Sequence, residues 1–297
     1  MKKIKIIANP SSGRETALTK VMQLINLLSK DDCQILLQFT HRENDSSKFA
    51  QEDDGEDMVV CCGGDGTVNG VVNGMVKSKR RKPLAILQCG TVNDFATSLK
   101  LPTNINSFYN MLKKGKTMDV DLGQANGRAF VNVAAGGLLT EIAYTTSEDT
   151  KTALGSMAYY IEGAKELLKG EMFKKENLLE VKVDCEELKE KEKISLFIIA
   201  NSPSVGGFKK MAPAAEVSDG YLDVILIKGM EFFDIPEFVR ALLNGKHVDH
   251  NKVIYLKTKN LKMTSNRDIV VDLDGERAGN LPMEFKVLEK ALTVVIN

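Results

Sequence analysis

Two glycine-rich turns, each containing an aspartate, are the parts of this sequence best suited to chemistry. The first is CCGGDGTVNGVVNG at 61–74, where Asp65 comes shortly after an apolar run. The second is CGTVNDFA at 89–96, where Asp94 comes shortly after another apolar run. A turn from a strand into a helix presents unpaired backbone N–H groups and the positive end of a helix dipole, which suit an anion such as phosphate. Each turn therefore has the features of a phosphate site with a carboxylate inside it.

The common nucleotide-binding fingerprints do not fit the first turn. Its loop contains no Lys, which excludes G-x-x-x-x-G-K-[ST], and Asn69 takes the last glycine position of G-x-G-x-x-G. Gly66, Gly70 and Gly74 recur every four residues and line one face of the following helix. Because glycine costs a helix about 1 kcal/mol relative to alanine, this stripe predicts close approach of a neighbouring element. The alternative interpretation is a tight turn and a packing stripe without a ligand.

A third carboxylate, Asp121, lies in MDVDLG at 118–123. Asp94 alone could be explained as a helix cap. However, two consecutive parallel strands that end in such turns place Asp65 and Asp94 at the carboxyl edge of the sheet, where open α/β folds bind ligands. Three carboxylates would repel a phosphate unless a divalent cation lay between them, and Mg²⁺ binds through carboxylates, water and phosphate oxygens. The sequence therefore predicts an Mg²⁺ site, with direct and water-mediated contacts both left open.

The elements that must position these residues alternate between strands and helices up to about residue 123. Short β-rich apolar runs predict strands at 3–8, 34–39, 58–62 and 84–88. Helical patterns predict helices at 16–29, 44–51, 67–77 and 104–114. Because this alternation is typical of a parallel sheet with crossover helices, we predict an open parallel α/β nucleotide-binding domain at 1–123.

Strands dominate the chain from residue 124 onward. They are predicted at 128–134, 178–184, 194–200, 221–227, 252–257, 269–273, 283–287 and 291–296, with helices at 152–168 and 232–243. Turns rich in Gly, Asn and Asp between these strands are typical of an antiparallel sandwich. The predicted fold class is therefore α/β plus all-β, with a C-terminal antiparallel β-sandwich domain at 124–297. A cleft between the two domains is the default ligand site.

The composition is that of an ordinary globular protein. Hydrophobic residues make up 43%, charged residues 27%, and the formal net charge is zero. No global field attracts nucleic acid or an acidic membrane, so such a contact would need a local patch. The five cysteines form no C-x-x-C pair and are predicted to be reduced core thiols of a cytoplasmic protein. No apolar run approaches 18 residues, so neither a membrane span nor export by a signal peptide is expected.

Four motifs together resemble those of a known family. NPSSG at 9–13, GGDGT at 63–67, GTVNDFA at 90–96 and DGE at 274–276 look like the diacylglycerol kinase catalytic family, which also contains sphingosine and ceramide kinases. The resemblance covers nearly the whole chain and is closest to the soluble bacterial diacylglycerol kinases. It implies an Mg²⁺-dependent lipid kinase of phospholipid metabolism that transfers the γ-phosphoryl of ATP to diacylglycerol and forms phosphatidic acid. The nucleotide would lie against the GGDGT loop, and the lipid would enter the interdomain cleft.

The resemblance also implies roles for individual residues. The ATP site would be lined by Asn9, Ser12, Arg14, Thr40, Gly64, Asp65, Gly66, Thr67, Thr91 and Asn93. The Mg²⁺ network would comprise Asp65, Asp94 and Asp121, with Asp65 also serving catalysis. A separate structural Mg²⁺ would be held by Asp219 and the backbone carbonyls of Glu216 and Tyr221. Asp274 or Glu276 would accept the proton of the lipid hydroxyl, and a simple Asp-Gly hairpin turn is the alternative for this motif.

Two residues depart from the family pattern. Arg14 stands where close relatives often carry Lys, a change that keeps the charge but alters the geometry of phosphate contact. Glu162 occupies a position where related enzymes carry a Lys that is thought to bridge the domains. Lys165 lies three residues later on the same helix face and could replace that Lys.

Other functions stay open on the sequence. GGDGT is shared with NAD kinases, although Asn93-Asp94 replaces the Asn-Glu pair expected there. Another lipid acceptor, such as a sphingoid base or phosphatidylglycerol, is a second alternative. The third is a non-catalytic regulator that binds a lipid or a nucleotide. The expected partners are ATP, Mg²⁺, a lipid and a membrane surface contacted peripherally from the cytoplasm, with no nucleic acid and with a homodimer left open.

Three further features have a structural and a functional interpretation. The basic cluster KSKRRK at 77–82 is taken as a solvated helix end, with docking on an anionic bilayer as the alternative. His247 and His250 are predicted to lie in an exposed loop, because a third His or Cys ligand is missing nearby. The Phe-rich segment 229–243 is predicted to pack in the core, with contact to lipid as the alternative.

Overall fold

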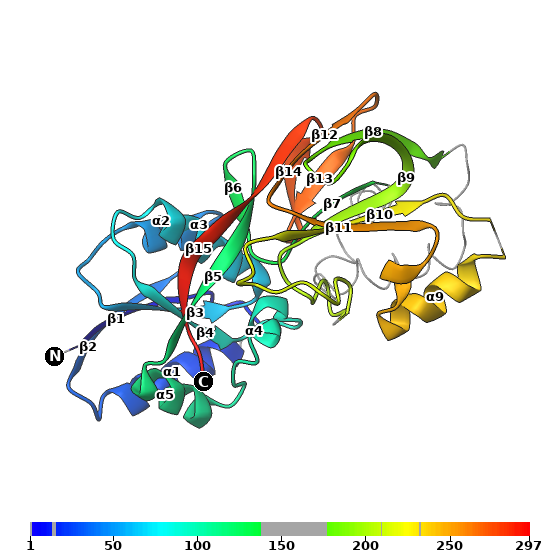
Figure 1. Cartoon of the computed structure of the whole chain (residues 1–297). Coiled ribbons are helices and arrows are strands. Elements are labelled where there is room, and N and C mark those ends of the chain that lie inside the picture. The colour runs from blue at the N-terminus through cyan, green and yellow to red at the C-terminus, as the bar shows by residue number, and fades with distance from the viewer. Residues whose placement is uncertain (1, 14–15, 138–176, 209, 232) are drawn as a thin grey trace. The chain divides into compact units, whose positions relative to one another are not determined.

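The structure, a computed structural model, describes residues 2–13, 16–137, 177–208, 210–231 and 233–297 (Figure 1). The chain divides into two compact units. The first comprises Met1–Leu122 and Glu289–Asn297, and the second comprises Gly123–Leu288. An N-terminal α/β unit is followed by a β-sandwich-like unit, which confirms the predicted fold class.

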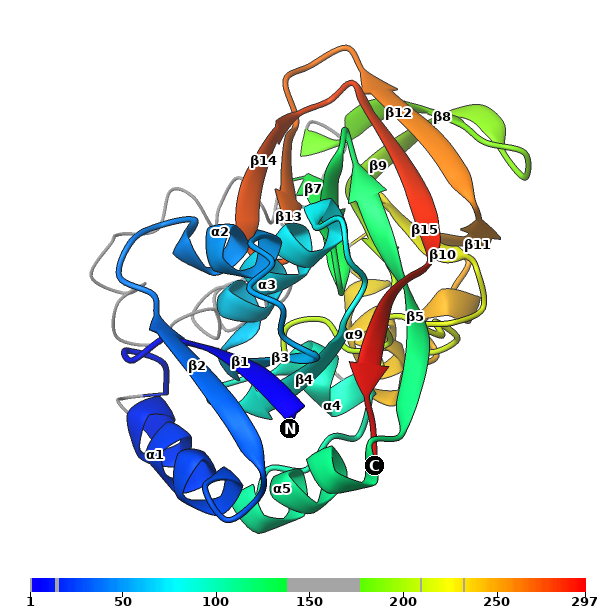
Figure 2. The ribbon, with the colours of Figure 1, turned by 90° about the vertical axis from the view of Figure 1, so that its left-hand side faces the viewer.

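The first unit is built on a parallel sheet. Its strands are β1 (Lys2–Ala8), β2 (Cys33–Phe39), β3 (Met58–Gly63) and β4 (Pro83–Gln88), in the order β2-β1-β3-β4. All six residues of β3 are buried, which explains its continuous apolar run. The helices are α1 (Thr16–Leu28), α2 (Asp45–Gln51), α3 (Asp65–Lys77), α4 (Asp94–Ser98) and α5 (Ile105–Lys114). Figure 2 shows α1 and α5 on one face of this sheet and α2 and α3 on the other.

The glycine stripe of α3 packs against α2. A Cβ atom added to Gly70 would lie 2.0 Å from Ser46 Oγ, and one added to Gly74 would lie 2.1 Å from the backbone oxygen of Ser47. The close approach predicted for these two glycines is therefore confirmed. Glycine is tolerated in α3 despite its low helix propensity because a side chain at Gly74 would meet the backbone of α2 and one at Gly70 would meet the Ser46 side chain.

The last residues of the chain belong to the first unit, contrary to the prediction that 124–297 form one domain. Residues predicted as two strands form one long strand, β15 (Met283–Val295). Its end pairs with β4 in parallel, with Thr293 opposite Pro83 and Val294 opposite Leu84. Leu292, Val294 and Val295 are buried there. Pairing with β4 removes these apolar side chains from water, which is the physical reason that the chain returns.

The second unit is an antiparallel sandwich. Its strands are β6 (Arg128–Phe130), β7 (Val133–Gly137), β8 (Leu179–Asp184), β9 (Lys189–Ala200), β10 (Leu222–Lys228), β11 (Val253–Thr258), β12 (Asn260–Ser265), β13 (Val270–Leu273) and β14 (Glu276–Asn280). β5 (Thr117–Ala125) leads into it and pairs with β6. β9 is apolar on both faces because Phe197 and Ile199 join one core while Leu196 and Ile198 join the other. The predicted helix at 152–168 lies outside the described residues.

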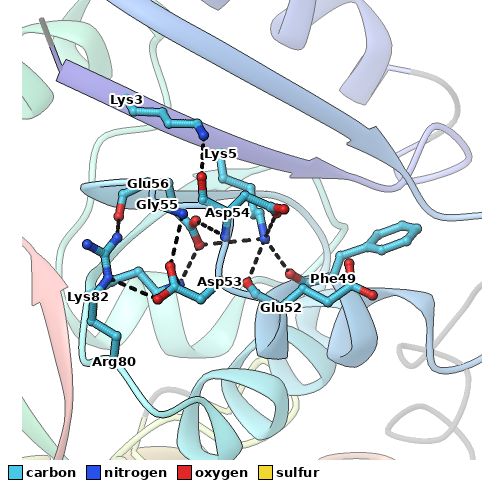
Figure 3. Close-up of polar contacts among 10 residues, drawn as sticks. All are labelled: Lys3, Lys5, Phe49, Glu52, Asp53, Asp54, Gly55, Glu56, Arg80 and Lys82. Carbon is cyan, nitrogen blue, oxygen red and sulfur yellow. Dashed lines mark hydrogen bonds and ion pairs between the residues drawn. The ribbon is translucent and has the colours of Figure 1, made fainter.

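A buried cluster of ion pairs anchors the C-terminal end of α2 to the sheet (Figure 3). The Lys5 side chain is 0% exposed, and its Nζ donates to the backbone oxygens of Phe49 and Glu52, each at 2.8 Å. Glu56 accepts from Lys82 and lies 3.5 Å from Lys5 Nζ. Burial alone would raise the pKa of Glu56, but the Lys82 hydrogen bond and the two lysine charges lower it overall. The carboxylate is therefore held in its charged form inside the unit.

The basic cluster at 77–82 is largely paired within the protein. Lys82 joins the buried cluster through Glu56, Arg80 pairs with Asp53, and Arg81 pairs with Asp119. The prediction of a solvated helix end is therefore wrong for Lys82, whose side chain is 2% exposed. Lys77, Lys79, Arg80 and Arg81 are exposed, so docking on an anionic bilayer stays the alternative for this cluster. None of the helices formed by the described residues is long and apolar enough to cross a membrane.

Candidate active site

Loops from four strands meet at the carboxyl edge of the parallel sheet. The Asn9 N–H donates to the Cys62 carbonyl at 2.9 Å, and the Cys89 N–H donates to the Gly63 carbonyl at 3.1 Å. Thr40 follows β2 and donates its N–H to the Ala8 carbonyl at 2.9 Å. These bonds continue the ladder of the sheet into the loops. Backbone from NPSSG, GGDGT and CGTVND, all predicted to line a nucleotide site, is thereby gathered at one edge.

The two glycine turns touch each other through their backbones. A Cβ added to Gly90 would lie 2.5 Å from the Cα of Gly64, and a Cβ added to Gly64 would lie 3.2 Å from the Cα of Gly90. No side chain fits between the turns. Glycine is required at position 90 by this contact, whereas a Cβ at position 64 would be tight against the backbone of Gly90.

Asp65 and Asn93 join the two turns through a hydrogen bond. Asp65 is the first residue of α3, and its Oδ2 accepts the backbone N–H of Asn93 at 2.9 Å. Asn93 has a φ of 56°, and its side chain bonds both the N–H and the carbonyl of Gly90. Asn tolerates this left-handed conformation better than most residues do. Asp94 follows as the first residue of α4 and is buried.

The remaining residues predicted for the nucleotide site differ in exposure. Thr67 is buried, and its Oγ1 accepts from Asn9 Nδ2 at 3.4 Å. Ser12 and Thr40 are half-buried, and Thr91 is exposed. Arg14 lies outside the described residues, as do Glu162 and Lys165.

Asp121 is held by the returning C-terminal strand. It lies on β5, is 1% exposed, and its Oδ1 accepts the Lys290 N–H at 2.6 Å. Within the part of the chain that the structure describes, no three or more His, Cys, Asp or Glu side chains form a group that could hold a metal ion. Mg²⁺ commonly uses only one or two carboxylates, together with water and phosphate oxygens. Asp65 and Asp94 at the paired turns can supply the two carboxylates. The network of Asp65, Asp94 and Asp121 stays a prediction.

The residues predicted to hold a structural Mg²⁺ form a tight turn in the second unit. Asp219 accepts the Tyr221 N–H at 3.0 Å through Oδ1, and its own N–H donates to the Glu216 carbonyl at 3.4 Å. Asp219 Oδ2 lies 2.6 Å from Lys257 Nζ. The carboxylate thus already faces a cation, and an Mg²⁺ at this turn would have to share it with Lys257. This site also stays a prediction.

Asp223, a buried carboxylate beside that turn, was not predicted from the sequence. It is 1% exposed and faces Lys257 across the β10–β11 pair. Burial raises the pKa of Asp223 to about 6, against the opposing effects of the Tyr255 hydroxyl and the Lys257 charge. A carboxylate inside the apolar run Leu222–Ile227 is a signal that the sequence contains, but no local pattern identifies Lys257 as its partner.

The two carboxylates of the DGE motif have different environments. Asp274 accepts backbone N–H groups from Val131 at 2.7 Å and from Asn132 and Val133 at 2.9 Å each. Its φ of 52° is unusual for a residue other than glycine. Glu276 is exposed and pairs with Arg128. Three backbone donors occupy the oxygens of the Asp274 carboxylate, so it is better suited to fixing the 131–133 segment than to accepting a proton.

Both histidines of HVDH pack against Phe238, at centroid distances of 6.4 Å for His247 and 5.7 Å for His250. The predicted exposed loop is wrong for His247, which is 0% exposed and donates from Nε2 to the Met211 carbonyl at 2.8 Å. The HVDH segment packs against Phe238 of α9 (Ile235–Asn244), whose buried residues are all apolar. Phe238 is fully buried, which confirms core packing there, whereas Phe233 is 76% exposed.

All five cysteines are free thiols, as predicted, and four of them are buried. Burial raises the pKa of the Cys61, Cys62 and Cys89 thiols, which makes them unreactive at neutral pH. They therefore support the sheet edge by packing and carry no chemistry of their own.

Two cationic residues near the predicted sites were not among the residues predicted from the sequence. Lys20 donates from Nζ to the Gln88 carbonyl at the end of β4, and Arg128 pairs with Glu276. Lys20 interrupts an apolar helical stripe, which is a signal that the sequence contains. Arg128 lies in a polar hairpin, where no local pattern distinguishes it from a solvated surface residue.

Comparison with known proteins agrees with this geometry. The family model described as the diacylglycerol kinase catalytic domain matches residues 3–125, and the YegS C-terminal NAD kinase beta sandwich-like domain matches residues 133–296. A diacylglycerol kinase of Staphylococcus carnosus is 33% identical over 99% of this chain and 94% of its own length. A diacylglycerol kinase of Staphylococcus aureus is 32% identical over 99% of this chain and 92% of its own length.

Solved structures show the same fold over the whole chain. The crystal structure of a diacylglycerol kinase from Bacillus anthracis has a TM-score of 0.80 and 26% identity, and covers 100% of this chain and 97% of that one. Another Bacillus anthracis structure has a TM-score of 0.85 and 27% identity, and covers 100% of this chain and 95% of that one. The paired turns, the sandwich and these matches together show that the chain belongs to the diacylglycerol kinase catalytic family and is a kinase.

Proposed function

We propose that this kinase transfers the γ-phosphoryl of ATP to the free hydroxyl of diacylglycerol and forms phosphatidic acid, with Mg²⁺ as the cofactor. The observation that carries this proposal is the pair of glycine turns joined by the Asp65–Asn93 hydrogen bond. Phosphoryl transfer depends mainly on positioning and on charge stabilisation, and these turns offer backbone donors next to carboxylates. The names of the relatives support diacylglycerol as the acceptor.

The nucleotide side of the reaction is assigned to the first unit. Backbone N–H groups of the GGDGT turn would bind phosphate oxygens, because they lie at the N-terminus of α3, the positive end of its helix dipole. Asp65 and Asp94 would hold Mg²⁺, whose charge would offset that of the polyphosphate. The hydrogen bond from Asn93 orients the Asp65 carboxylate before any ligand arrives. Asn9, Thr40, Thr67 and Thr91 are assigned to the same nucleotide site.

The acceptor side is assigned to the second unit, with Glu276 as the general base. Glu276 is exposed, whereas the Asp274 carboxylate is occupied by three backbone donors. A base must reach the hydroxyl proton, and an exposed carboxylate on a hairpin can do so once it separates from Arg128. Asp274 would set the geometry of the hairpin that presents Glu276. The pairing with Arg128 would restrict the Glu276 rotamers in the absence of lipid.

A labelled-ATP assay tests the proposal. The full-length protein is incubated with Mg²⁺ and labelled ATP against separate diacylglycerol, sphingosine, ceramide, phosphatidylglycerol and NAD acceptors. We expect label only in phosphatidic acid. Transfer to NAD, or to another lipid in preference to diacylglycerol, would overturn the acceptor assignment. Transfer that persists unchanged in excess chelator would overturn the role of Mg²⁺.

A further inference from the structure

Lys20 occupies a core-facing position of α1. The helix buries Ala17, Val21, Leu24 and Leu28, and Lys20 lies three residues after Ala17 and four before Leu24 on the same face. Its side chain is only half-buried. Lys20 Nζ donates to the Gln88 carbonyl at 2.6 Å, at the last residue of β4. A charged residue in this stripe is thus directed to the carboxyl edge of the sheet.

The Lys20 ammonium lies close to the start of both glycine turns. Cys62 comes directly before GGDGT, and Cys89 comes directly after Gln88. Burial raises the pKa of each thiol, and the Lys20 charge acts on both in the opposite direction. This shared effect agrees with the hydrogen bond to Gln88, which places the charge where the two strands end.

Three of the four described loops at this edge contain no positive side chain, and the fourth, after β2, contains the exposed Arg42. Residues 9–13, 63–67 and 89–94 contain Asp65 and Asp94 but neither Lys nor Arg. A polyphosphate bound there would meet two carboxylates. A half-buried ammonium below the turns offsets part of that negative charge, and its effect is greater than that of an exposed lysine because it is less screened by water.

We propose that Lys20 is a positioning residue of the nucleotide site. By bonding the Gln88 carbonyl it holds the end of β4, from which the chain turns through Gly90 to Asn93 and so to the contact with Asp65. Its charge favours polyphosphate at the paired turns. This inference rests on the proposed nucleotide site in the first unit, and it does not depend on the identity of the lipid.

The test measures binding of MgATP to the full-length protein by isothermal titration calorimetry, without any acceptor. The variants are K20M, which removes the charge and the donor, K20R, which retains both, and K30M, which removes an exposed lysine just beyond α1. We expect K20M to weaken binding about tenfold or more, K20R to stay within about threefold of the original protein, and K30M to be unchanged. In the labelled-ATP assay, K20M should raise the KM for ATP and leave the KM for lipid unchanged.

Circular dichroism melting separates this role from a purely structural one. K20M that melts at a lower temperature but binds MgATP with unchanged affinity below its transition would overturn the inference. Equal weakening by K30M, or no binding of MgATP by the original protein, would also overturn it. If K20M weakens nucleotide binding while diacylglycerol receives no phosphoryl group, the inference stands and the lipid assignment fails. If K20M does not fold, K20R tests the inference. An affinity of K20R for MgATP that is more than about tenfold weaker would contradict the role of the charge.

Discussion

The carboxylate of Asp65 accepts the backbone N–H of Asn93 at 2.9 Å, although 28 residues separate them in the sequence. This bond connects the first residue of α3 to the turn before α4. It fixes the Asp65 carboxylate at the edge where Gly64 and Gly90 touch. Asp65 is therefore oriented by the fold before a nucleotide or a metal ion arrives.

Replacement of Asp65 by Ala should abolish turnover while the fold persists. Loss of the carboxylate removes charge stabilisation from the transferring phosphoryl group, and we expect kcat to fall by at least about 100-fold. Loss of the Asn93 bond should cost only about 1.5–3 kcal/mol of unfolding free energy. Steady-state kinetics and urea unfolding measure the two effects.

Asp57→Ala is the matched control for Asp65. Its carboxylate also accepts one backbone N–H, from Lys3 at 2.8 Å, but it lies just before β3 at the opposite end of that strand. We expect Asp57→Ala to retain the original kcat. A normal rate for Asp65→Ala would remove Asp65 from the catalytic site.

The two carboxylates of the DGE motif should separate into a catalytic and a structural residue. Glu276→Gln should lower kcat by about 100-fold or more, since general-base catalysis contributes factors of this size, and should leave stability nearly unchanged because Glu276 is exposed. Asp274→Ala should lower the unfolding free energy by at least about 2 kcal/mol, because three backbone donors lose their acceptor. Kinetics and urea unfolding of both variants provide the comparison. Full activity of Glu276→Gln would return the base assignment to Asp274.

Alanine at the two stripe glycines of α3 should destabilise the protein to different degrees. At Gly70 the obstacle is the Ser46 hydroxyl, which can rotate away, whereas at Gly74 it is the backbone carbonyl of Ser47. Alanine favours a helix by about 1 kcal/mol over glycine, and this gain offsets part of the cost. We expect Gly74→Ala to cost about 2 kcal/mol or more and Gly70→Ala to cost less, as measured by urea unfolding. Equal effects of the two substitutions would show that α2 shifts as a whole.

Burial of His247 should make the protein less stable as the pH falls through the histidine range. Burial lowers the pKa of His247 below its ordinary value of 6.5, despite the opposing bond to the Met211 carbonyl. The unfolded chain therefore takes up a proton at a higher pH than the folded protein does, so stability is complete above about 6.5 and is lost below it. His247→Gln should flatten the pH dependence of the melting temperature between about pH 5 and 7.

His250→Gln is the matched control for His247. His250 also packs against Phe238 but is only half-buried, so we expect the original pH dependence in this variant. Equal flattening by the two substitutions would contradict the assignment of the effect to the buried ring.

The sequence by itself determined the features that depend on local patterns. Apolar runs followed by glycine turns predicted β3 and β4 with Asp65 and Asp94 after them, because strand period, helix period and turn chemistry are properties of neighbouring residues. The glycine spacing in α3 predicted a close neighbour for the same reason. The four motifs together indicated the family, and the matches over both units confirmed it.

Only the tertiary structure decided which distant groups meet. The bonds from Asn93 to Asp65, from Val131–Val133 to Asp274 and from Lys20 to Gln88 all join segments far apart in the sequence. The return of β15 to β4 and the burial of Lys5 and Lys82 are of the same kind. The sequence does not mark which acceptor a backbone N–H group or a long charged side chain will bind. Those partners are set by strand register and by the cost of burying an unpaired polar group. Strand register and the cost of burying a polar group act only when the whole chain is folded.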